Sequence, residues 1–340
     1  MAANETDIER LIDVHDATAT IAGSVLVEPV GSFTVPEGVK AKRKTPWGIF
    51  REMPVLVKAS VLWLLFILFS SIYAQLDIRV FNGALPLGDP NLQLNGFNPE
   101  TGEFGTNVRL EGPSWQHPLG TDALARDTFS RAIHGSYVSV TVAVVSVMCG
   151  VIIGGLLGSI AGYVRGKTET GLMAMLDVVL AFPALVLLLA LISIFEVRSL
   201  FVISLVIGVL SIPAYTRVSR ANSLAISNRE FVTAAQAIGT KRWTILRREI
   251  IPNVLPTLLA YAMVAAAAVV VVEGTLSFLG LSVQLPQATW GNMINQARGD
   301  IRLNFSQVLY PALILTLTVL ALNQVGDFFQ RRSSFRGSSL

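Results

Sequence analysis

Long apolar segments dominate this 340-residue chain and constrain its fold more than any other feature. Six of them approach or exceed the roughly 20 residues that a helix needs to cross a bilayer core about 30 Å thick. They run from about 55 to 74, 137 to 163, 172 to 195, 200 to 218, 254 to 278 and 308 to 325. We therefore expect an all-α polytopic membrane protein with six transmembrane helices.

The composition agrees with this expectation. Charged residues make up only 14% of the chain, against about 25% in ordinary soluble domains, and the mean hydropathy is +0.58. A disordered chain is ruled out, and a simple soluble enzyme is disfavoured. The 26 basic and 23 acidic residues nearly balance, so nucleic-acid binding is not expected. The single cysteine, Cys149, lies in an apolar run, which excludes a disulfide framework and a cysteine-based metal site.

Glycines and prolines inside these segments predict how the helices pack. Small residues line the second segment at spacings that let helices approach closely, namely Gly150, Gly154, Gly155, Gly158 and Gly162. Pro183 and Pro213 fall within the third and fourth segments. Membrane helices tolerate such breaks where neighbouring groups satisfy the freed backbone atoms.

Basic residues predict the orientation. When the N-terminus is placed in the cytoplasm, most of the 26 basic residues, including every lysine, fall on the cytoplasmic side. Both termini are then cytoplasmic. The predicted organisation is a tail over 1–53, a first transmembrane helix over 54–76, an extracytoplasmic loop region over 77–135, a transmembrane core over 136–327 that contains a cytoplasmic loop over 219–253, and a tail over 328–340.

The cytoplasmic loop has the pattern of two short helices. Ser227 and Glu230 have the spacing of a capping box at a helix start, and Gly239 is placed to end that helix in a left-handed conformation. A second, basic helix is expected over about 242–250, ending at Pro252. This pair could be an ordinary interfacial helix pair among lipid head groups or a docking element.

The run from Thr233 to Pro252 resembles the EAA loop of ABC-importer permeases. That loop reads Glu-Ala-Ala, three residues, Gly, nine residues, Ile, one residue, Leu-Pro. The matching residues are Ala234, Ala235, Gly239 and Pro252. Thr233 replaces the glutamate, Glu249 the isoleucine and Ile251 the leucine.

Further motifs resemble the C-type permeases of dipeptide, oligopeptide and nickel importers. Their HPLGTD-x-x-G-R-D signature is matched by His117, Pro118, Leu119, Gly120, Thr121, Asp122, Arg126 and Asp127. Ala125 stands where that signature has glycine. The segments 276–281 and 290–292 resemble their LSFLGLG and WGN segments, and Asp177 with Pro183 matches their third-span pattern. The resemblance covers about residues 117–330.

The resemblance implies the type I ABC-importer permease fold in the inner cell membrane and a transport role for peptides. It implies a homologous second permease subunit, two ATPase subunits and an extracytoplasmic substrate-binding protein as partners, with the helix over 229–239 coupling to an ATPase. No cofactor or metal is expected in this chain, because ATP and Mg would be bound by the ATPases. The ATPase-coupling residues would be Glu230, Thr233, Ala234, Ala235, Gly239, Thr240, Lys241 and Pro252.

No catalytic constellation is found in the sequence, so a membrane-embedded enzyme is disfavoured. Residues 161–168 (AGYVRGKT) fit a loose nucleotide-loop pattern, but an apolar helix precedes them where that loop needs a strand, so we expect a tight basic turn. Two alternatives stay open. The same machinery could carry nickel chelates or glutathione, or an ion-coupled secondary transporter could use the intramembrane carboxylates Asp177 and Glu273.

Overall fold

The computed structural model describes residues 46–81, 87, 89–94, 97–98, 103–104, 109–194 and 199–337. The chain divides into two units, Met1–Glu52 and Met53–Leu340. In the first unit, the described residues form one short helix, α2 (Pro46–Glu52). The predicted tail up to residue 45 lies outside the described residues, as does much of the predicted outer loop between residues 82 and 108.

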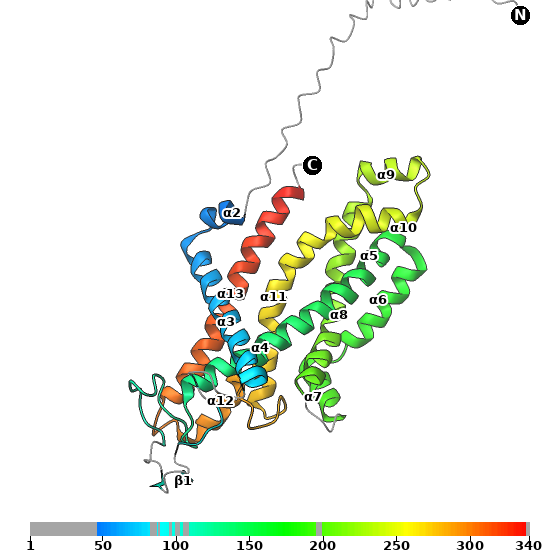
Figure 1. Cartoon of the computed structure of the whole chain (residues 1–340). Helices are drawn as coiled ribbons and strands as arrows, with labels where there is room; N and C mark the ends of the chain where they lie inside the picture. Colours follow the sequence, from blue (N-terminus) through cyan, green and yellow to red (C-terminus); the bar gives the residue numbers. More distant parts are fainter. Residues whose placement is uncertain are drawn as a thin grey trace, which may run out of the picture. The chain divides into compact units, whose positions relative to one another are not determined.

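The second unit is a helical bundle with a small antiparallel hairpin in its loop region (Figure 1). Its long helices are α3 (Val55–Leu76), α4 (Thr128–Cys149), α5 (Gly155–Val164), α6 (Gly166–Leu180), α7 (Ala184–Ile194), α8 (Leu200–Ser227), α11 (Ile251–Phe278) and α13 (Ser306–Gly337). Shorter elements are η1 (Asp77–Phe81), β1 (Phe97–Asn98), β2 (Glu103–Phe104), η2 (Gly150–Gly154), α9 (Glu230–Ala237), α10 (Arg242–Ile245), η3 (Leu246–Ile250), α12 (Trp290–Ala297) and η4 (Arg298–Asp300). The helix α5 packs against α8, α11 against α13, and α3 against both α4 and α13.

Five of the described helices are long and apolar enough to cross a membrane, and a sixth crossing requires α6 and α7 to act together. The predicted third span over 172–195 is therefore not one helix, because α6 and α7 meet at a bend of 82°. Pro183 explains the break. Proline has no N–H to donate, and its ring disfavours the α conformation at the preceding residue, Phe182.

The predicted glycine packing in the second span is confirmed. The helix there runs from Thr128 to Val164 through the π-helical turn η2. A Cβ on Gly154 would lie 2.7 Å from the Cβ of Tyr215, and one on Gly158 would lie 2.6 Å from that of Ser219 on α8. Glycine alone permits this approach, and the Ser219 hydroxyl then donates to the Gly155 carbonyl at 2.7 Å.

Several helices are longer than their apolar segments predict. The helix α4 begins at Thr128, inside the loop region predicted for 77–135. The helix α8 continues to Ser227, inside the loop predicted for 219–253. The helix α13 continues to Gly337, inside the tail predicted for 328–340. Hydropathy reports only the part of a helix that lies among hydrocarbon, so these polar ends were assigned to loops.

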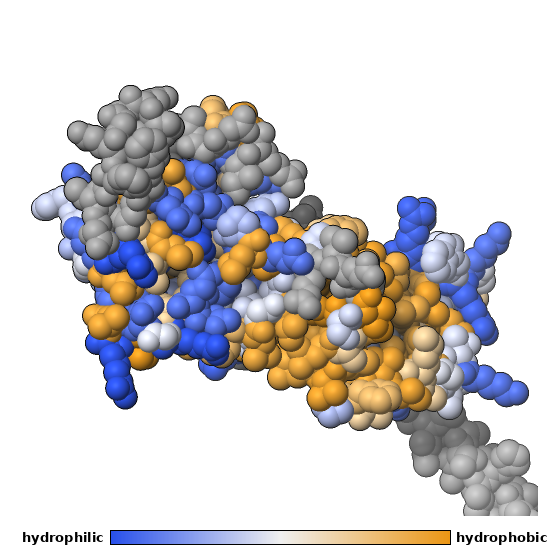
Figure 2. All heavy atoms as spheres, turned by 90° about the horizontal axis from the view of Figure 1, so that it is seen from below, coloured by the Kyte–Doolittle hydropathy of each residue, from blue (hydrophilic) through white to orange (hydrophobic). Residues whose placement is uncertain are grey.

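Large apolar side chains remain exposed on the bundle. Phe69 on α3, Phe201 on α8 and Val186 on α7 are each at least 60% exposed. Figure 2 shows hydrophobic side chains gathered over one part of the face seen from below, beside a part covered by hydrophilic ones. Exposed apolar surface of this extent needs a cover of lipid or protein, as expected for a membrane-spanning bundle.

Candidate functional site

The short helix α9 lies at the end of the bundle where α8 joins α10, away from α12 (Figure 1). Gly239 ends it with a φ of +79°. The N–H of Gly239 donates to the Gln236 carbonyl at 3.0 Å, and that of Thr240 donates to the Ala235 carbonyl at 3.1 Å. These two bonds form a Schellman motif, so the predicted left-handed glycine is confirmed.

The predicted capping box at the start of α9 is wrong. Ser227 is the last residue of α8, and its Oγ donates to the Leu224 carbonyl at 2.9 Å. The N-cap of α9 is Arg229, which is extended with φ −81° and ψ 152°, and Glu230 is the first helical residue. Because α8 continues past its apolar segment, it takes up the serine that the spacing assigned to α9.

The predicted separate helix over 242–250 is also not observed. The elements α10, η3 and α11 form one continuous helix from Arg242 to Phe278. Pro252 does not end this helix, because it is the second residue of α11 and follows the π-helical turn η3. Pro252 therefore lies inside the continuous helix, where its missing N–H falls directly after the irregular hydrogen bonds of a π-helical turn.

One residue holds α9 against the bundle. Val232 is fully buried in an apolar cluster with Tyr215, Ile245 and Ile250. Ala235, one turn further along α9, is half-buried against the same cluster. Part of the Ala235 side chain stays exposed, and its role in ATPase coupling stays a prediction.

The outward side of α9 is apolar and bulky. Phe231 is 40% exposed and Ile238 is 82% exposed, with the exposed Ala234 between them at helical spacing. Basic residues continue this surface beyond the helix. The exposed members are Lys241, Arg242, Arg247 and Arg248, and Trp243 among them is 62% exposed. Glu230 and Thr233 are exposed on α9 as well. A partner that contacts α9 would thus meet an apolar centre with a basic border.

A second turn supports the base of α9. The predicted basic turn at 161–168 is confirmed, since α5 ends at Val164 and α6 begins at Gly166. Between them Arg165 donates from Nη2 to the Ser227 hydroxyl at 3.0 Å and to Asn228 Oδ1 at 2.6 Å. This arginine therefore ties the α5–α6 turn to the α8–α9 turn.

The signature segment over 117–127 folds into a compact loop before α4. Asp127 is the N-cap of α4 and accepts the Ser130 N–H at 2.8 Å. Its other oxygen lies 2.6 Å from His117 Nδ1. The backbones of Thr121 and Asp127 pair in an isolated antiparallel β-bridge. Gly120 turns the chain with a φ of +74°. The polar residues of this signature thus shape the loop.

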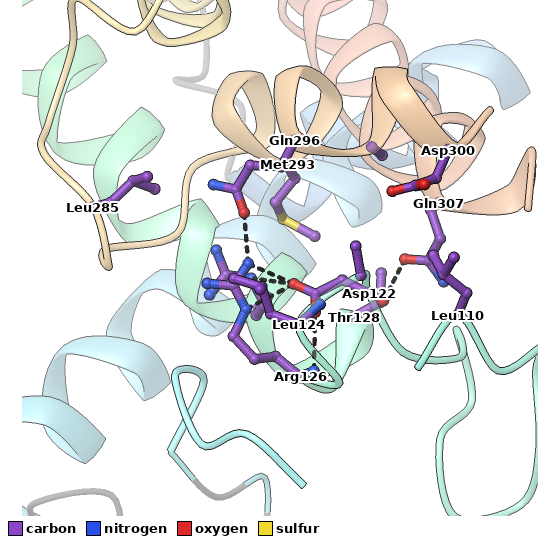
Figure 3. A pocket seen from close by; sticks show the side chains of 13 residues that line it. Leu110, Asp122, Leu124, Arg126, Thr128, Leu285, Met293, Gln296, Asp300 and Gln307 are labelled. Carbon is purple, nitrogen blue, oxygen red and sulfur yellow. Dashed lines mark hydrogen bonds and ion pairs between the residues drawn. The ribbon is translucent and has the colours of Figure 1, made fainter. Parts of the chain in front are cut away.

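Asp122 is the centre of this loop. It accepts the backbone N–H groups of Leu124 and Arg126 at 2.9 Å and the Arg126 Nε at 2.7 Å. Arg126 also donates to Gln296 on α12 at 2.5 Å (Figure 3).

The same loop is joined to α13. Thr128 donates to Gln307 Oε1 at 2.6 Å, and Gln307 Nε2 donates to the Leu119 carbonyl at 3.3 Å. A cavity of about 290 Å³ lies between the loop and α12. Pro118 precedes Leu119 and is exposed. The signature therefore fixes α4, α12 and α13 to one another at this end.

The two predicted intramembrane carboxylates lie in different surroundings. Glu273 on α11 is fully buried and accepts bonds from the Ser139 hydroxyl at 3.0 Å and the Ser282 hydroxyl at 3.3 Å. Asp177 on α6 is exposed and pairs with Arg217 on α8 at 2.5 Å. Within the described residues, no three His, Cys, Asp or Glu side chains are grouped so that they could hold a metal ion.

Sequence reasoning missed the residues that orient α9. Val232 and Ala235 are three residues apart and share one side of the helix, and Phe231 and Ile238 are seven residues apart and share another. This helical spacing is the only signal that could have separated the inner from the outer side. Arg217 was also missed. Its place at the end of the apolar segment 200–218 is the signal that could have indicated a functional charge near the membrane boundary.

Fold and site together define a polytopic membrane protein with the short helix α9 at one end and a fixed loop at the other. Residues 154–337 match the model of the family described as "Binding-protein-dependent transport system inner membrane component". The chain belongs to this family and is a permease component of an ABC importer.

Similar proteins include the glutathione transport system permease protein GsiD of Pectobacterium atrosepticum, which is 36% identical over 64% of this chain and 72% of that protein. GsiD of Escherichia coli O6:K15:H31 is 38% identical over 64% of this chain and 71% of that protein. Among solved structures, the inward-facing MetNI methionine ABC transporter covers 60% of this chain and 97% of that chain with a TM-score of 0.51 at 20% identity, a likeness in fold. Family membership removes the ion-coupled carrier alternative.

Proposed function

We propose that this chain forms half of the translocation pathway of an ATP-driven importer of small peptides. Its relatives GsiD are described as glutathione transport permeases, and glutathione is itself a small peptide. The signature at 117–127 and the motif at 233–252 support the same class. In this proposal a homologous permease supplies the other half, and two partner ATPases supply the energy.

The observation that carries the proposal is the outward apolar face of α9. Phe231, Ala234 and Ile238 are exposed on a helix whose opposite side is fixed by the buried Val232. A partner that binds the outer face of α9 would move α8 and α11 with it, because the inner side of α9 is packed against both helices. ATP-driven closure of the ATPases would thereby tilt these spans and switch the access of the pathway.

Orientation follows from the same proposal. The end that carries α9 would face the cytoplasm, where the exposed Lys241, Arg242, Arg247 and Arg248 agree with the excess of basic residues on that side. The end that carries α12 and the signature loop would then face the extracytoplasmic binding protein. Both chain termini would be cytoplasmic.

A charge on the α9 face tests the proposal. We would tag the chain, purify it in mild detergent and identify its partners by native mass spectrometry, comparing the wild type with Ile238→Glu. The wild type should carry a second permease and two P-loop ATPases, and Ile238→Glu should keep the permease and lose the ATPases. Leu303→Glu is the matched control, because Leu303 is 76% exposed and precedes α13 near the other end. Wild-type protein that purifies without ATPases, or Ile238→Glu protein that retains them, would contradict the proposal.

A further inference from the structure

Two helices of the bundle are joined by an ion pair whose side chains the rest of the chain does not cover. Arg217 on α8 and Asp177 on α6 meet at 2.5 Å, and their side chains are 53% and 60% exposed. A buried ion pair would serve as a brace inside the protein. An exposed pair on spanning helices instead faces whatever lies beside these helices in the membrane.

The charges of the pair argue against hydrocarbon as its surroundings, and both residues lie near the ends of the apolar segments 172–195 and 200–218. Asp177 lies about 16 Å along α6 from its start, and Arg217 lies about 15 Å along α8 from its end, at a rise of about 1.5 Å per residue. Both ends lie at the side of the bundle that carries α9. A charge inside the hydrocarbon costs about 2.5–3.5 kcal/mol on insertion scales, so such side chains face protein or water.

The backbone beside the pair gives a second, independent reason. The Asp177 carbonyl accepts one of the last helical N–H groups of α6, from Ala181, and the chain then bends by 82° before α7. Non-helical backbone at membrane depth is tolerated only where it is covered by protein or lines a water-filled cavity. Broken helices of this kind form substrate sites in other transporters. Open charges and a broken helix therefore occur together at one place.

We propose that Arg217 and Asp177 line the translocation pathway and bind the two charged ends of a zwitterionic peptide. This proposal rests on the proposed function and names a site for its substrate. The guanidinium of Arg217 would take the peptide carboxylate, for which its planar fork of donors is suited. The carboxylate of Asp177 would take the peptide ammonium group. In the absence of peptide, the two side chains neutralise each other, as observed.

The chain offers a matched control pair on the same two helices. Arg220 donates from Nε to Glu169 at 2.6 Å, and Glu169 is only 18% exposed. This pair also joins α8 to α6, but it lies closer to the ends of both helices and is more enclosed. A variant that removes its charges measures what the loss of an α6–α8 brace costs.

The experiment is ATP-driven uptake into proteoliposomes that contain the whole importer and its binding protein. The probes are radiolabelled trialanine with free ends, its C-terminal amide and its N-acetyl form, each normalised to wild-type uptake of the same probe. Arg217→Gln should lower uptake of free trialanine at least tenfold and that of the amide by no more than twofold. Asp177→Asn should show the same contrast between free and N-acetyl trialanine. Arg220→Gln should affect all three probes equally.

If the wild type imports the blocked peptides poorly, the contrast between free and blocked probes cannot be measured. A variant in which the charges of residues 177 and 217 are exchanged then provides the test. The double variant Asp177→Arg with Arg217→Asp preserves an ion pair but reverses its direction, and it should assemble normally with uptake still lowered at least tenfold. Full recovery of uptake in this double variant would show that the pair is a brace and overturn the proposal. Equal losses for free and blocked probes, or loss of the second permease from the complex, would overturn it as well. A wild-type importer that takes up neither trialanine, dialanine nor glutathione would instead refute the proposed function.

Discussion

Shortening Val232 to alanine should detach α9 from the bundle. Val232 is fully buried, and Val232→Ala removes two methyl groups from the cluster that it shares with Tyr215 and Ile250. Each buried carbon group contributes about 0.8 kcal/mol, and the remaining cavity adds to the loss, so we expect a cost of roughly 2 kcal/mol. An eight-residue helix is well below the length at which helices are stable alone, so α9 depends on this anchor.

A cost of roughly 2 kcal/mol corresponds to an increase of roughly thirtyfold in the detached population. Hydrogen exchange of the purified protein in nanodiscs, read by mass spectrometry, measures this population directly. The amides of residues 231–239 should exchange up to thirtyfold faster in Val232→Ala, while those in the middle of α11 should not change. Thr233→Ala is the control, because Thr233 is exposed on the same helix. Wild-type exchange rates over α9 in Val232→Ala would refute the assignment of Val232 as its anchor.

Three further substitutions and one control test backbone and packing arguments, the last by hydrogen exchange and the others by thermal unfolding in detergent. Ala125 has a φ of +57°, where its Cβ is disfavoured, but its methyl group is also buried, so Ala125→Gly should change the stability by less than about 1 kcal/mol, and a loss well beyond the roughly 0.8 kcal/mol of a buried methyl group would show that Ala125 is not strained. Gly158→Val should cost roughly 1–3 kcal/mol, because its Cβ would lie 2.6 Å from that of Ser219, whereas Gly171→Ala, with open space around it, should cost nothing. Gly239→Ala should cost about 1 kcal/mol at φ +79°, seen as faster exchange at the end of α9.

The sequence predicted the bundle because a bilayer imposes strict lengths on apolar segments. Five of the six expected segments correspond to single spanning helices, and the glycine stripe of the second correctly predicted close packing. The third segment was misread as one helix. Hydropathy contains no information on the direction of the helix axis. The 82° bend at Pro183 depends on which neighbouring groups form hydrogen bonds with the backbone groups that the break leaves without helical partners.

The site was harder to predict because it depends on which side of a short helix faces the bundle. The motif at 233–252 located α9, but it did not show which side of the helix faces the bundle, where the buried Val232 and the half-buried Ala235 lie. The capping box failed for a related reason, since Ser227 fits both the end of α8 and the start of α9 by sequence alone. In both cases long-range packing decided between two locally acceptable structures.

The central claim is that the outer face of α9 contacts an ATPase, and site-directed cross-linking tests it most directly. In a Cys149→Ala background, Ile238→Cys places a thiol on a residue that is 82% exposed on this face, and Leu303→Cys places one on a residue that is 76% exposed elsewhere. With the partner ATPase co-expressed, a maleimide–benzophenone reagent that is attached to the introduced thiol and activated by light, and so needs no thiol on the partner, should join this chain to the ATPase from position 238 and not from position 303. Cross-links from neither position, or from both alike, would contradict the account.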